Sequence, residues 1–199
     1  MKTLFTTTAA AALLMASVAS AENFKETQFR TVLQAGNMEF SMGTVQGELD
    51  TIETRFSVAR YTLGNFDNEV MLGVGYGRLT DTLAFTMDYN VETSFDERFG
   101  AYGIMSLAYV TPTGALDAGD LFVTPTLGLS YALTPEASVY GDVSYTWVAT
   151  NAWAQDGGAV ELGLVYDLTD SFSMNPAIVR TFNTESDRTN FKLELTYRF

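Results

Sequence analysis

Alternation of apolar and polar side chains is the feature that most restricts the fold of this chain. In the segments 83–91 and 191–199, every second residue is apolar and the residues between are mostly polar. A period of two is typical of β-strands with one face in an apolar environment, whereas an amphipathic helix repeats at three and four. The same period returns from Met38 to the end of the chain, so we expect an all-β protein.

The alternation predicts about ten strands, with eight as the alternative. They are expected at 38–46, 51–63, 69–79, 82–92, 99–110, 121–132, 137–149, 159–168, 172–182 and 190–199. Turn-forming sequences separate them, such as "GNFDN" at 64–68 and "LTDS" at 168–171. The segment 24–37 could hold a further strand. In strand 99–110 the outer face is either Met105-Leu107-Tyr109 or Tyr102-Ile104-Ala108-Val110.

The first 21 residues have the pattern of a secretory signal peptide. One lysine precedes a run rich in Ala, Leu and Met, and the small residues Ala19-Ser20-Ala21 follow. We therefore expect residues 1–21 to be removed on export and residues 22–199 to form one domain. The chain has no cysteine, so no disulfide supports this exported domain.

Periodicity does not by itself say whether the apolar face meets a core or a lipid bilayer. A soluble barrel turns its apolar face inward, and a membrane barrel turns it outward. Aromatic residues near strand ends favour the membrane barrel, because such rings prefer the bilayer interface. Short connections also alternate with longer polar ones, and the last strand runs to the end of the sequence. A soluble barrel that binds an apolar ligand is the less favoured reading.

The end of the chain resembles the assembly signal of Gram-negative outer-membrane β-barrel proteins. The matching residues are Phe191, Leu193, Leu195, Tyr197 and Phe199. Residues 22–199 resemble a small barrel of the OmpA or opacity type, often labelled porin family. The resemblance implies a closed antiparallel up-and-down barrel in the bacterial outer membrane. It also implies outer-membrane lipid, lipopolysaccharide, the barrel-assembly machinery and periplasmic chaperones as partners. No residues follow Phe199, so we expect no peptidoglycan-binding domain of the OmpA type.

Composition argues against several activities. The chain contains no histidine and no cysteine, so a serine nucleophile would lack its usual proton acceptor. The acid pairs Asp96-Glu97 and Asp117/Asp120 are interpreted as solvated loop residues. A net charge of −13 disfavours nucleic acid as a partner. We expect no enzyme activity, no cofactor and no bound metal, and the oligomeric state is left open.

Polar residues on the second face are expected to line the lumen. They are Glu53, Arg55, Asp88, Glu92, Asp142, Glu161, Lys192, Glu194 and Arg198. If opposite charges pair across the lumen, they close it, and the barrel has a structural role in the cell envelope or presents its loops to partners. If they do not pair, the barrel is a narrow, weakly cation-selective diffusion pore for small solutes.

Overall fold

The computed structural model describes residues 28–41, 44–78, 80–116, 118–150, 156–182 and 188–198, and all of its regular elements are strands. In chain order they are β1 (Gln28–Ser41), β2 (Thr44–Leu63), β3 (Phe66–Gly77), β4 (Thr82–Ser94), β5 (Phe99–Pro112), β6 (Asp120–Thr134), β7 (Ala137–Val148), β8 (Gly157–Thr169), β9 (Phe172–Phe182) and β10 (Arg188–Arg198). No helix in these ranges is long and apolar enough to cross a membrane.

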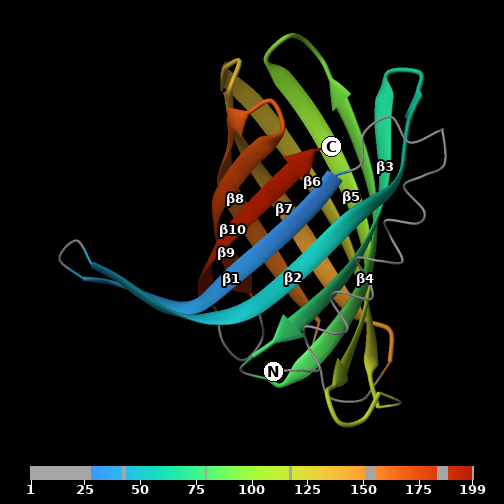
Figure 1. Ribbon diagram of the computed structural model, residues 1–199, viewed down its shortest axis with the longest axis vertical. Coiled ribbons are helices and arrows are strands. Elements are labelled where there is room, and N and C mark those ends of the chain that lie inside the picture. Colours follow the sequence, from blue (N-terminus) through green and yellow to red (C-terminus); the bar gives the residue numbers. More distant parts are fainter. Residues whose placement is uncertain are drawn as a thin grey trace.

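The ten strands form one closed barrel in which each strand pairs antiparallel with its neighbours in sequence (Figure 1). Closure comes from β1 and β10, which pair from Gln28 opposite Arg198 to Ala35 opposite Phe191. The last strand, β10, therefore has a hydrogen-bonded partner on each side, because its other edge pairs with β9. The prediction of a closed ten-stranded up-and-down barrel is confirmed.

The outside of the barrel is apolar. Leu127, Leu162 and Val143 have exposed fractions of 69%, 67% and 56%, and many other large apolar side chains around the barrel are exposed as well. Buried apolar side chains are few in the described part of the chain, and buried polar ones include Glu69, Asp88 and Thr196. This arrangement inverts that of a soluble barrel and fits a wall that faces lipid.

Connections of different length lie at the two ends of the barrel. Gln28, Arg198 and the connections 64–65, 95–98, 135–136 and 170–171 lie at one end, here called the short-turn end. It is the upper end in Figure 1, where the C-terminus is marked. At the opposite end, β5, β7 and β9 end and β6, β8 and β10 begin, and more residues of the sequence separate these strands than at the short-turn end.

The first two strands differ from the prediction. The expected strand 38–46 spans the connection at 42–43, and β1 instead begins at Gln28. The segment 24–37, which the pattern left ambiguous, therefore contributes most of a strand. β1 and β2 also continue as a two-stranded ribbon beyond their other neighbours, because β10 reaches only Ala35 and β3 only Thr51 (Figure 1).

Candidate functional site: the polar lumen

The structure places all nine polar residues predicted for the lumen on the inner face. Six of them line one cavity: Glu92, Asp142, Glu161, Lys192, Glu194 and Arg198. The other three, Glu53, Arg55 and Asp88, form one cluster of ion pairs. In β5, Tyr102 and Ile104 line the cavity, so Met105, Leu107 and Tyr109 form the outer face of this strand.

Arg55 is the centre of the cluster, whose residues come from β2 and β4. Its Nε and Nη2 donate to the two carboxylate oxygens of Glu53 at 2.8 and 2.9 Å, a bidentate arrangement. Its Nη1 lies 2.8 Å from Oδ2 of Asp88, whose exposed fraction is only 1%. Thr86 adds a hydroxyl donor to Glu53 at 2.8 Å. One arginine therefore neutralises part of a buried acid pair.

Three long side chains cross a glycine to reach the strand beyond it. Arg55 is opposite Gly73, Tyr102 is opposite Gly128, and Tyr140 is opposite Gly163. A β-carbon on Gly128 or Gly163 would overlap the tyrosine ring that lies over it, and one on Gly73 would overlap the Thr86 hydroxyl and press on the Arg55 stem.

The hydroxyl groups of the two tyrosines both contact carboxylates. The Tyr102 hydroxyl donates to Oδ2 of Asp142 at 2.7 Å, and the Tyr140 hydroxyl contacts both Glu161 and Oδ1 of Asn175. Lys192 from β10 pairs with the same Glu161. The two rings meet edge to face with centroids 6.3 Å apart. Together with the Arg55 cluster, these contacts form a layer of bonded side chains near the middle of the lumen, here called the central layer.

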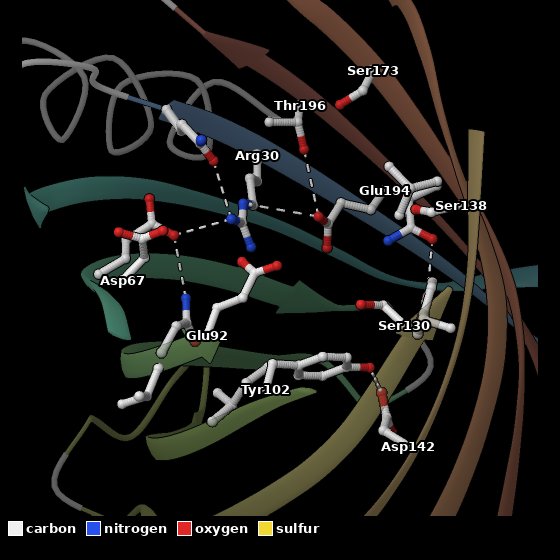
Figure 2. A pocket seen from close by; sticks show the side chains of 18 of the residues that line it. Arg30, Asp67, Glu92, Tyr102, Ser130, Ser138, Asp142, Ser173, Glu194 and Thr196 are labelled. Carbon is white, nitrogen blue, oxygen red and sulfur yellow. Dashed lines mark hydrogen bonds and ion pairs between the residues drawn. The ribbon is translucent and has the colours of Figure 1, made fainter. Parts of the chain in front are cut away.

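A cavity of about 580 Å³ occupies the lumen between the central layer and the short-turn end. On β7, β8 and β10 its lining reaches as deep as Asp142, Glu161 and Lys192, and on β5 it reaches Ile104, one inward position past Tyr102. Arg30 projects into this space (Figure 2), where its Nη2 donates to Glu69 and Gln28, each at 3.0 Å. Its Nε lies 3.9 Å from Glu194. The cavity is therefore polar and open toward the short-turn end.

Sequence reasoning missed several residues of this lumen. Arg30 falls in the segment left ambiguous, and Tyr102 belongs to the strand with two possible phases. Glu69 begins an expected strand, but nothing in the sequence shows that Arg30 is its partner. Asn175 lies within the expected strand 172–182, so its inward position could have been predicted from the alternation in that strand alone.

The loop acids behave in different ways. Asp96 is exposed and accepts the backbone N–H groups of Arg98 and Phe99, both at 2.7 Å, which lowers the pKa of its carboxyl. Asp120 was expected to be solvated, and this is wrong. It is fully buried, with the Thr150 hydroxyl donating to Oδ1 at 2.7 Å. Asp117 lies outside the described residues. No group of three or more acidic side chains in the described ranges is arranged to hold a metal ion.

The residues of the predicted assembly signal lie along the closing seam. Phe191, Leu193, Leu195 and Tyr197 occupy the outer face of β10, opposite Ala35, Leu33, Thr31 and Phe29 of β1. Phe199 lies outside the described residues. These side chains face away from the lumen, as a lipid-facing strand requires, and their role as a signal stays a prediction.

Deletion of Phe199 tests that role. We expect less folded barrel in the outer membrane, with export and removal of residues 1–21 unchanged, because the resemblance places Phe199 at the end of the recognised pattern. Folded and unfolded forms can be separated by their different mobility in an unheated denaturing gel. Deleting a residue from the turn 135–136 instead would be the control for a general folding defect, and an unchanged folded yield without Phe199 would contradict the prediction.

Comparison with known proteins gives similarity in fold alone. No protein-family model and no curated protein sequence matches this chain. The KdgM porin in complex with disordered oligogalacturonate is similar in structure, with a TM-score of 0.51 and 11% identity over 87% of this chain and 99% of that chain. The NanC porin has a TM-score of 0.55 and 5% identity over 86% and 98%.

A third similar structure is the COG4313 outer membrane channel from Pseudomonas putida F1. Its TM-score is 0.54, with 10% identity over 90% of this chain and 97% of that chain. All three are outer-membrane barrels, and the outer face of this chain is apolar while its lumen is polar. The chain is therefore a β-barrel of the bacterial outer membrane.

Proposed function

We propose that this protein is a closed barrel with a structural or surface-interaction role in the cell envelope and no catalytic activity. The observation that carries the proposal is the central layer, in which Arg55, Tyr102, Tyr140 and Lys192 each bond to side chains of other strands. The cavity above it ends at this layer. Side chains that satisfy one another in this way hold a narrow lumen shut.

The charge of the lumen favours a second candidate, a narrow cation-preferring pore. Among the described residues, six acidic and four basic side chains line the cavity. They are Asp67, Glu69, Glu92, Asp142, Glu161 and Glu194 against Arg30, Arg60, Lys192 and Arg198. An acidic excess attracts cations and repels anions. This lumen is poorly suited to a polyanion such as the oligogalacturonate in the KdgM complex.

The finer assignment to the OmpA or opacity type belongs to the same proposal. It rests on the terminal pattern from Phe191 to Phe199 and on a barrel that pairs neighbours in sequence throughout. The proposed partners are outer-membrane lipid and lipopolysaccharide at the wall, and the barrel-assembly machinery and periplasmic chaperones during biogenesis. The absence of histidine and cysteine from the sequence supports a role without catalysis.

Conductance of the refolded protein in planar bilayers tests the closed barrel. We expect no current, or small and intermittent openings, because ions must pass the central layer. Lys192→Ala should raise the frequency of openings, since it removes the β10 contact to Glu161.

Arg98→Ala is the matched control, because it removes a positive charge from an exposed turn without changing the lumen. Arg98→Ala should leave the frequency of openings in the conductance record unchanged. Stable openings of the unmodified protein would overturn the closed barrel in favour of the pore, and a Lys192→Ala record identical to that of Arg98→Ala would show that Lys192 does not close the lumen.

A further inference from the structure

Tyr102 presents an aromatic face at the wall of the cavity. Its ring lies over Gly128, so one face of the ring is against the backbone of β6. Figure 2 shows the ring extending from β5 toward Asp142, whose carboxylate accepts the Tyr102 hydroxyl. Glu92 is the cross-strand neighbour of Tyr102 on β4. An acidic residue therefore lies near each end of the Tyr102 side chain, Glu92 beside its backbone and Asp142 at its hydroxyl.

Within the described ranges, these two carboxylates, like Asp67, have no basic partner, whereas the other three acids that line the cavity each pair with one. Arg55 pairs with Glu53 and Asp88, Lys192 pairs with Glu161, and Arg30 pairs with Glu69 and Glu194. In the described part of the chain, no basic side chain pairs with Glu92 or Asp142. The Tyr102 hydroxyl satisfies one oxygen of Asp142 without neutralising its charge.

A second observation points to a missing donor at the same wall. Glu69, with an exposed fraction of 7%, lines the cavity next to Asn90 on the neighbouring strand. The Glu69 Oε1 and Asn90 Oδ1 atoms are buried, and neither has a hydrogen-bond partner. Buried acceptors without donors are unfavourable, and they are common where a ligand or water is bound. Asn90 is two residues from Glu92 on the inner face of β4.

We propose that this cavity binds a small organic cation, with an ammonium or guanidinium group over the Tyr102 ring between Glu92 and Asp142. Aromatic faces attract such cations, and carboxylates accept hydrogen bonds from them. A second donor group of the ligand could reach the free oxygens of Glu69 and Asn90. The cavity volume of about 580 Å³ suits a small organic molecule rather than a bare metal ion.

The proposal rests on the proposed closed barrel in one respect, because the central layer supplies Tyr102 and Asp142, which form part of the site. Binding itself is an equilibrium property and can be measured without any current. The probe is 1,5-diaminopentane, titrated into the refolded full barrel in detergent micelles and followed by calorimetry. Pentane-1,5-diol, which has the same length and no charge, is the reference probe.

We expect saturable binding of the diamine at one site per barrel and none of the diol. Glu92→Gln and Asp142→Asn should each weaken binding at least about tenfold, because each removes a charge from the site. Tyr102→Leu should weaken it by about three- to thirtyfold, the range of a cation over an aromatic ring. Tyr102→Phe keeps the ring and should weaken it less than Tyr102→Leu.

Glu97→Gln is the matched control, since it removes the same charge from an exposed turn at the same end of the barrel. It should leave affinity within about twofold, as expected for a screened charge outside the site. An equal loss in this control would show that only net charge attracts the probe, and equal binding of the diol would exclude recognition of a cation. Either result overturns the proposal, as does the lack of saturable binding at millimolar probe.

Conductance recorded on the same preparation separates the two proposals. Stable openings together with selective diamine binding would overturn the closed barrel and leave the cation site intact. A silent barrel that does not bind the diamine would overturn the cation site and leave the closed barrel intact.

Discussion

Replacing Arg55 by methionine is expected to lower the free energy of unfolding by about 3–5 kcal/mol, the usual cost of removing one partner from a buried ion pair. The guanidinium makes a bidentate contact to Glu53 and a third contact to Asp88. Asp88 is almost fully buried, and its Oδ1 already lacks a hydrogen-bond partner. Without Arg55, the carboxylates of Glu53 and Asp88 would remain on the inner wall with no ion-pair partner. Denaturant unfolding in phosphatidylcholine vesicles measures the change.

The matched control is Arg180→Met, which makes the same substitution on β9 at an exposed position two residues from the end of the strand. Its Nη1 donates to the Thr189 hydroxyl at 2.9 Å, and an exposed contact of this kind contributes about 1 kcal/mol or less. Adding Asp88→Asn to Arg55→Met should recover part of the loss, because it removes one of the unpaired charges. If Arg55→Met and Arg180→Met lowered the free energy of unfolding by equally small amounts, the prediction would be wrong. Water in the lumen would then be solvating Glu53 and Asp88 in place of Arg55.

Arginine at position 143 should destabilise the barrel clearly more than arginine at position 144. Val143 lies near the middle of β7 on the outer face, with Leu127 and Val160 as its cross-strand neighbours. A charged residue facing lipid at this depth costs roughly 2–4 kcal/mol. Ser144 points to the lumen between Thr126 and Ala159, where an arginine can meet Asp142 or water. The two variants share one strand, one depth and one introduced side chain, so each is the control for the other.

Unfolding of Val143→Arg and Ser144→Arg in lipid vesicles gives the comparison. Crowding in the lumen adds some penalty to Ser144→Arg, which is why only the order of the two is predicted. A larger loss for Ser144→Arg would contradict the assignment of faces in β7, and with it the argument that the apolar wall meets lipid.

The faces of most strands could be predicted from the sequence because only one face of each strand is apolar. β4 and β10 are the clearest cases, and their polar residues lie inside. In β1, by contrast, apolar Val32 faces the lumen while Thr31 lies on the outer face. The period of two is therefore broken, and the strand could not be recognised. β5 is apolar on both faces, so its phase needed the registers with β4 and β6.

The contacts of the lumen could not be predicted for a different reason. Arg55 and Asp88 lie on strands that are not adjacent, and so do Tyr102 and Asp142. Which side chains meet depends on the register of each strand that lies between them. It also depends on whether that intervening strand has a glycine over which the long side chain can pass. Residue type alone indicated that both signs of charge were inside. It did not indicate that Glu92 and Asp142 would be left without a cation.

The tyrosines that lie over glycines also bear on strand alignment during folding. A slip of one residue turns the apolar face inward and is strongly disfavoured, but a slip of two residues keeps every side chain on its own face. Hydrophobic patterning therefore does not reject it. After such a slip between β5 and β6, Tyr102 would lie opposite Thr126 or Ser130 instead of Gly128, and the β-carbon there would occupy the place of the ring. The pair of Tyr102 and Gly128 therefore favours a single register between β5 and β6. The pair of Tyr140 and Gly163 does the same between β7 and β8.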